Sequence, residues 1–108
     1  MNVEITPAEL AAMLKLSSEG TPLLLDVREQ WEWDLAHLPG SVHIPMHLVP
    51  LRHNELPDDK PIVTICHHGV RSLQVASFLR NAGFEDVASL HGGLDAWSSQ
   101  VDPSIRRY

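Results

Sequence analysis

Residues 62–72 read Ile-Val-Thr-Ile-Cys-His-His-Gly-Val-Arg-Ser. The first four are apolar or β-branched, and a short run of this kind predicts a buried strand. A polar loop with one glycine follows, and a helical pattern begins at residue 71 or 72 and continues to residue 81. The single cysteine of the chain, Cys66, therefore lies between the carboxyl end of a strand and the amino end of a helix.

This position favours a reactive thiol. Ligands of open α/β sheets bind in the crevice at the carboxyl ends of the strands. The start of a helix offers unpaired N–H groups and a positive dipole end, and both stabilise a thiolate, the nucleophilic form of cysteine. Gly69 allows the backbone to curl so that several N–H groups point inward. We therefore expect Cys66 to be a nucleophile, although a lone cysteine often serves only as a small core residue.

Strands and helices are predicted to alternate along the rest of the chain. A capping box starts the first helix at Thr6, and Gly20 follows its end. The apolar stripe of this helix comprises Leu10, Met13, Leu14 and Leu16. Further strands are predicted at 3–5, 23–25, 42–44 and 87–90, further helical turns at 29–36, 46–51 and 94–99, and a polar loop at 54–60. This alternation predicts a parallel α/β sheet with right-handed crossovers.

Size and composition predict one globular domain, with its core at about residues 5–98 and a surface extension at 99–108. The chain has 108 residues, of which 44% are hydrophobic, and a net charge of −6. This charge argues against nucleic acid or an acidic membrane as partner. No run approaches the roughly 18 apolar residues of a membrane span. Residues 1–10 do not resemble a signal peptide, and one cysteine cannot form an internal disulfide, so we expect a cytoplasmic protein.

Four stretches together resemble the rhodanese (thiosulfate sulfurtransferase) family. Residues 66–72 fit the pattern Cys-x-x-Gly-x-Arg-Ser of its active-site loop. Residues 25–29 (Leu-Asp-Val-Arg-Glu), Glu32-Trp33 with 37–45, and 92–97 (Gly-Gly-Leu-Asp-Ala-Trp) resemble its other blocks. Ala36 and Ser41 stand where the family usually has glycine and alanine. The resemblance implies a single-domain member with a five-stranded parallel sheet flanked by helices on both faces.

The resemblance also implies a reaction in two steps. The thiolate of Cys66 attacks the outer sulfur of thiosulfate and expels sulfite, and the resulting persulfide passes its sulfur to cyanide or a thiol. The substrate would be held by the loop residues, through their N–H groups and the Arg71 guanidinium. These residues are His67, His68, Gly69, Val70, Arg71 and Ser72. Nothing in the sequence requires a metal or another cofactor.

Several side chains near the loop allow more than one interpretation. Asp26 and Arg28 end a predicted strand and are expected to brace the loop, or else to touch substrate; Arg28 and Glu32 have the spacing of a helical ion pair. His67 and His68 could bind an anion when protonated, line the rim, or hold a metal with Cys66. Trp31, Trp33 and Trp97 are expected to pack in or around the core, and His37 to make structural hydrogen bonds.

Three other functions compete with thiosulfate sulfurtransfer. A sulfur-relay carrier would use the same cysteine but take its sulfur from a donor protein. A non-catalytic binding module would not need Cys66. A phosphatase or arsenate reductase is disfavoured because five positions separate Cys66 from Arg71, one fewer than in the phosphate loop of cysteine phosphatases. Without a second cysteine, any persulfide must discharge to an outside acceptor.

Overall fold

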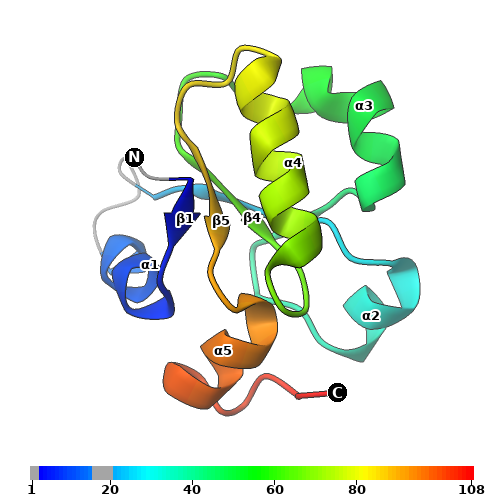
Figure 1. The fold of residues 1–108 in the computed structure, drawn as a ribbon. Helices are drawn as coiled ribbons and strands as arrows, with labels where there is room; N and C mark the ends of the chain where they lie inside the picture. Colours follow the sequence, from blue (N-terminus) through cyan, green and yellow to red (C-terminus); the bar gives the residue numbers. More distant parts are fainter. Residues whose placement is uncertain (1–2, 16–20) are drawn as a thin grey trace.

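The computed structural model describes residues 3–15 and 21–108 and confirms the α/β prediction (Figure 1). Five parallel strands form one sheet in the order β1-β5-β4-β2-β3. The strands are β1 (Glu4–Ile5), β2 (Leu23–Asp26), β3 (Val42–His43), β4 (Ile62–Ile65) and β5 (Val87–Leu90). Because β4 is central, the residue that follows it lies in the middle of the carboxyl edge of the sheet.

Helices cover both faces of this sheet, as the sequence predicted. Side chains alternate along β4, so Val63 and Ile65 face a core cluster with α1 and α5, whereas Ile62 belongs to the cluster formed with α3 and α4. Every residue of β4 and β5 is buried, as expected for parallel strands covered on both faces. The helices are α1 (Pro7–Leu14), α2 (Gln30–Leu35), α3 (Val49–Arg52), α4 (Val70–Asn81) and α5 (Gly93–Gln100).

The predicted element boundaries differ from the observed ones by one or two residues. Thr6 forms the predicted capping box, with its hydroxyl accepting from the Glu9 N–H and its own N–H donating to the Glu9 carboxylate. Helix α4 begins at Val70, one residue before the predicted start. The predicted polar loop at 54–60 was partly wrong, because His53–Glu55 forms a 3₁₀ turn. Leu16 and Gly20 lie outside the described residues.

Aromatic residues around α2 pack less deeply than the sequence suggested. Trp97 is buried in the core as predicted. Trp33 stacks on His37 at a centroid distance of 3.7 Å, and the Nδ1 atom of His37 lies 2.8 Å from the Trp33 carbonyl oxygen. Trp31, by contrast, is 59% exposed and lies outside the core, where its ring meets that of Tyr108 edge-on at a centroid distance of 5.7 Å.

The sequence predicted a surface extension at the end of the chain, but the last eight residues partly pack into the core. Ile105 is buried in the cluster that contains α1 and α5, and its carbonyl oxygen accepts a 2.6 Å hydrogen bond from the Ser98 hydroxyl. The chain then continues past α5 toward α2 (Figure 1). Tyr108 consequently reaches the carboxyl edge of the sheet, far in sequence from the strands that form it.

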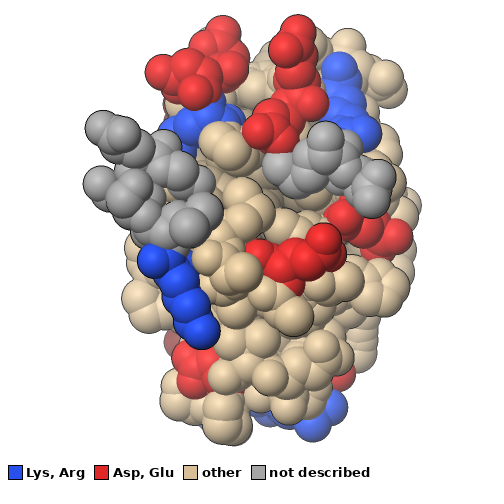
Figure 2. All heavy atoms as spheres, turned by 90° about the vertical axis from the view of Figure 1, so that its left-hand side faces the viewer, with Lys and Arg blue, Asp and Glu red and all other residues tan. Residues whose placement is uncertain are grey.

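The surface around α1 carries acidic and basic side chains separated by uncharged ones (Figure 2). The net charge of −6 therefore does not form one continuous acidic patch on this face. Among the described residues, no helix combines the length and the apolar character needed to cross a membrane.

Candidate active site

Cys66 directly follows β4 and is fully buried. Its Sγ atom accepts hydrogen bonds from the N–H groups of Gly69 (3.1 Å) and Ser72 (3.3 Å). The Cys66 thiol in turn donates to the Ser72 hydroxyl oxygen, at 3.3 Å. The loop therefore curls around the sulfur and directs donors at it, as expected from the strand–loop–helix pattern.

Two features of the sequence give the loop this shape. Gly69 has a φ of +100°, a left-handed conformation that side chains disfavour, and it is the N-cap of α4. Ser72 is held by side chains of the sheet. Its hydroxyl lies 2.7 Å from that of Ser89, and its carbonyl oxygen accepts a 2.8 Å hydrogen bond from the Thr64 hydroxyl. These buried contacts tie the loop to β4 and β5.

The start of α5 supports the loop from the other side. The N–H groups of Leu94 and Asp95 donate to the carbonyl oxygens of Cys66 (2.9 Å) and His67 (3.1 Å). Gly93 allows this approach, since a Cβ atom there would lie 2.4 Å from both carbonyl oxygens. The Gly92-Gly93 pair noted in the sequence thus has a structural explanation, because it lets the first N–H groups of α5, which have no partner within the helix, donate to carbonyl oxygens of the Cys66 loop.

Asp26 and Arg28 form a buried pair beneath this edge, with 1% and 0% of their side chains exposed. The Arg28 guanidinium donates to both Asp26 oxygens, at 2.7 Å for the shortest contact, and to the Ala36 carbonyl oxygen at 2.6 Å. Burial alone would lower the pKa of Arg28, but its hydrogen bonds to Asp26 and Tyr108 outweigh burial and raise it. The expected helical pair of Arg28 with Glu32 is wrong, because Arg28 turns to Asp26.

Glu32 instead holds Arg71, an arrangement that the sequence did not predict. Two parallel hydrogen bonds join them, from Nη1 to Oε1 at 2.6 Å and from Nη2 to Oε2 at 2.9 Å. Glu32 is 4% exposed and Arg71 is 33% exposed. Burial tends to raise the pKa of Glu32, but the hydrogen bonds from Arg71, Tyr108 and the Glu29 N–H lower it to about 2. In turn, Glu32 raises the pKa of Arg71.

Tyr108 completes this network. Its hydroxyl donates to Oε2 of Glu32 at 2.5 Å and accepts from Nη1 of Arg28 at 3.0 Å. Its ring stacks on His67, with centroids 3.9 Å apart and planes 13° from parallel. Burial and the bond to Glu32 raise the pKa of Tyr108 to about 12. Glu32 could have been suspected from its place in a family block, but no pattern in the sequence pointed to Tyr108.

The loop histidines have different environments. His67 lies under Tyr108 and its pKa is lowered by burial and by the nearby His68, so the neutral ring is favoured. His68 is exposed. A metal-ligand grouping brought together among the described residues is His67, His68 and Asp95, with one possible ligand atom from each within 4.8 Å of the others. It does not include Cys66, and both Asp95 oxygens already accept bonds from Arg107.

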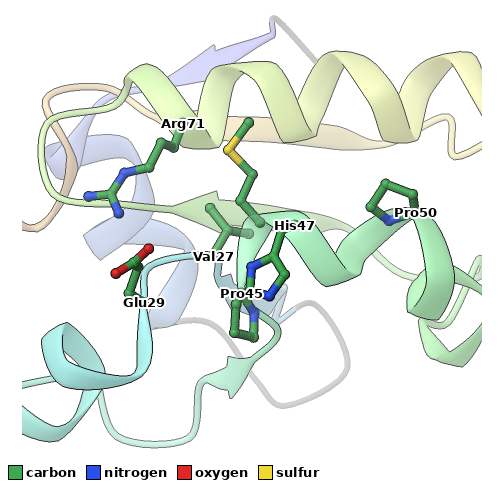
Figure 3. Close-up of a pocket in the computed structure, with 7 residues that line it drawn as sticks. Val27, Glu29, Pro45, His47, Pro50 and Arg71 are labelled. Carbon is green, nitrogen blue, oxygen red and sulfur yellow. The ribbon is translucent and has the colours of Figure 1, made fainter.

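A pocket of about 450 Å³ opens beside the loop (Figure 3). Figure 3 shows Arg71 and Glu29 at one end of it and Pro50 at the other. Its lining comprises Val27, Glu29, Pro45, Met46, His47, Pro50 and Arg71. Of the residues that the sequence assigned to the site, Arg71 lines this pocket, while Asp26 and Arg28 lie buried behind it.

The rhodanese-like domain model matches residues 6–100. The chain belongs to the rhodanese family. Its fold agrees closely with that of a rhodanese-like domain protein from Staphylococcus aureus, with a TM-score of 0.83 at 28% identity over 97% of each chain.

Curated relatives share the chemistry of sulfur transfer. A sulfurtransferase of Allochromatium vinosum is 36% identical over 84% of this chain and 85% of its own length. A thiosulfate sulfurtransferase, GlpE, of Pseudomonas syringae is 37% identical over 84% of this chain and 83% of its own length. The chain also matches a probable adenylyltransferase/sulfurtransferase, MoeZ, of Mycobacterium tuberculosis at 38% identity, but it spans only about a quarter (26%) of that protein.

Proposed function

We propose that this rhodanese is a thiosulfate sulfurtransferase that carries sulfur as a persulfide on Cys66. In the first half-reaction, the Cys66 thiolate attacks the outer sulfur of thiosulfate. A new S–S bond forms, the S–S bond of thiosulfate breaks, and sulfite leaves with its electron pair. In the second, cyanide or a thiol attacks the outer sulfur of the persulfide and releases the Cys66 thiolate. We also propose a cytoplasmic location, on the basis of the single cysteine and its incompatibility with an internal disulfide.

The ring of polar groups around Cys66 carries this proposal. The N–H groups of Gly69 and Ser72 donate to Sγ at 3.1 and 3.3 Å, and the Cys66 thiol donates to the Ser72 hydroxyl oxygen at 3.3 Å. The two fixed N–H dipoles stabilise negative charge on the sulfur both before attack and when Cys66 leaves again. A thiol that served only to fill the core would not need three polar partners.

The rest of the loop has supporting roles in this proposal. The backbone of His67, His68 and Val70 shapes the ring, and Arg71 is the cation beside it. Glu32 fixes the orientation of the Arg71 guanidinium through two hydrogen bonds. Asp26 and Arg28 act as a brace, since both are buried and Arg28 directs its donors into the protein rather than toward solvent.

Intact mass after incubation with thiosulfate tests the proposal. The wild type should gain one sulfur, about 32 Da, and cyanide should remove it. Cys66→Ser should gain nothing, and it is a fair control because the serine hydroxyl keeps a similar size and can accept the same N–H bonds. If the wild type gains no mass, or if the variant gains as much, the proposed persulfide on Cys66 is wrong.

A sulfur-relay carrier is a second candidate, because one relative is named a putative sulfur carrier protein, YrkF, of Bacillus subtilis (39% identical over 82% of this chain and 48% of that protein). Such a carrier would load Cys66 from a persulfide on a donor protein. Rapid loading by a protein persulfide, with thiosulfate loading at least about 100-fold slower, would favour it over the thiosulfate enzyme. The opposite order would favour thiosulfate as the donor.

A further inference from the structure

The 450 Å³ pocket beside the loop is bounded by residues that pack in or against the buried cluster containing Cys66. Val27 lines the pocket and belongs to the same buried cluster as Cys66, and Met46 packs against that cluster. This wall is fixed by the sheet, since the Val27 N–H donates to the Ile65 carbonyl oxygen at 2.9 Å and the Met46 N–H donates to that of Val27 at 2.9 Å. The wall of the pocket is therefore joined to the end of β4, and Cys66 is the next residue of the chain.

The volume of the pocket exceeds the volume that an inorganic sulfur anion occupies. Thiosulfate has five heavy atoms, whereas pockets of roughly 300–1,000 Å³ accommodate drug-sized organic ligands. A second hollow adjoins the pocket. Met46 and Pro50 line both this pocket and an adjoining hollow of about 160 Å³, whose other walls include Val75 and Phe78.

The lining of the pocket suits a neutral carbon chain better than a dianion. Val27, Pro45, Met46 and Pro50 supply apolar walls. The charged groups in the lining, Glu29 and Arg71, have opposite signs, and Figure 3 shows both at one end. The charge of Arg71 is further matched by Glu32. An inorganic dianion would gain little there, whereas an alkyl chain would bury apolar surface along the whole length.

We propose that the sulfur acceptor is a small organic thiol with an apolar tail, and that the tail binds between Met46 and Pro50 while its thiol lies at the Arg71 end. This rests on the persulfide of Cys66 proposed above. The acceptor R–SH attacks the outer sulfur of Cys66–S–S⁻. A bond forms between the sulfur of R–SH and the outer sulfur, and the bond between Sγ of Cys66 and the outer sulfur breaks. The products are R–S–SH and the Cys66 thiolate. Charge and protons balance, and no oxidant is needed.

Single-turnover transfer with two acceptors tests this site. The protein is loaded with thiosulfate, its mass is checked, and excess donor is removed. It is then mixed with 2-mercaptoethanol or 6-mercaptohexan-1-ol, and the loss of the added sulfur is timed. The readout is the ratio of the two rate constants, long chain over short, each corrected for the thiolate fraction of that thiol. Full burial of a methylene is worth roughly fourfold, so we expect a ratio of at least about 10 for four methylenes.

Three variants locate the preference. Met46→Gln keeps the length of the side chain but makes it polar, and should reduce the ratio to near one; Met46→Leu should restore it. Leu51→Gln is the matched control, because Leu51 lies on α3 close in sequence but is 79% exposed and does not line the pocket. It should keep the wild-type ratio.

The outcomes separate the two proposals. Failure to gain sulfur from thiosulfate would overturn the proposed function and, with it, this acceptor site. If the persulfide forms but the wild-type ratio is near one, the acceptor site alone is wrong. A high ratio that Met46→Gln leaves intact, or that Leu51→Gln lowers equally, would also overturn the assignment to this pocket.

Discussion

Two acid–arginine pairs lie at the carboxyl edge of this rhodanese sheet, and they differ in kind. Asp26 and Arg28 are two residues apart, at the end of one strand, and both are fully buried. Glu32 and Arg71 are 39 residues apart, on α2 and α4, and Arg71 remains one-third exposed. Tyr108 touches both pairs, bonding Glu32 on one side and Arg28 on the other.

The difference shows which pair serves the architecture and which serves the loop. A buried ion pair contributes little net stability as a unit. Removing one partner, however, leaves the other charge buried without a counter-charge, which strongly destabilises the fold. The Asp26–Arg28 pair therefore acts as a structural brace. The Glu32–Arg71 pair instead connects the start of α4, next to the Cys66 loop, to α2, and its two hydrogen bonds fix the orientation of the Arg71 guanidinium.

Breaking the buried pair should have the largest effect. Arg28→Met should reduce the free energy of unfolding by about 3–5 kcal/mol, because Asp26 would stay buried without a counter-charge. Urea unfolding followed by circular dichroism measures this loss. The double variant Asp26→Leu with Arg28→Met should recover part of it. A loss below about 1 kcal/mol in the single variant would mean that Asp26 does not depend on Arg28.

Removing the charge of Glu32 should cost less and should depend on pH. The folded-state pKa of Glu32 is about 2, below its ordinary value of 4.5, so its ionised form stabilises the fold above pH 4.5. This contribution, about 3 kcal/mol, is lost as pH falls from 4.5 to 2. Glu32→Gln should therefore be less stable than the wild type at pH 7 and nearly equal to it at pH 2. Parallel curves of stability against pH would contradict this.

Tyr108→Phe should have a smaller effect, because it removes only the hydroxyl that links the two pairs. One hydrogen bond to a charged group contributes about 1.5–3 kcal/mol, and the stacking of the ring on His67 remains. Thermal unfolding measures the change. Tyr108→Ala, which also removes the ring, should be less stable still. Equal stability of Tyr108→Phe and the wild type would show that the two pairs are independent.

The exposed pair of Arg52 and Glu55 provides the lower limit of this series. Their side chains are 40% and 53% exposed, and such pairs contribute little because water screens them. Arg52→Ala should leave the urea midpoint unchanged. A clear decrease would indicate that α3 depends on this contact, and the comparison with the buried pairs would then need revision.

Several parts of the site followed from local chemistry. The run Ile62–Ile65 is apolar or β-branched and predicted a buried strand, which placed Cys66 at its carboxyl end. Gly69 was recognised as the residue that turns the loop, and its φ of +100° confirms this. The Gly92-Gly93 pair was recognised as a signature, but its contact with the carbonyl oxygens of the loop depends on where α5 lies and was not predicted.

By itself, the sequence determined the order of strands and helices, the family and the position of the thiol, because these depend on short-range periodicity and on residues close together in the chain. Only the tertiary structure decided that Arg71 meets Glu32, that Tyr108 joins both pairs, and that Met46 and Pro50 line a pocket together with Arg71. Those contacts follow from the strand order β1-β5-β4-β2-β3, which brings α2, α4 and the last residues to one edge. No local pattern encodes that convergence, because it arises from the packing of distant segments on a shared sheet.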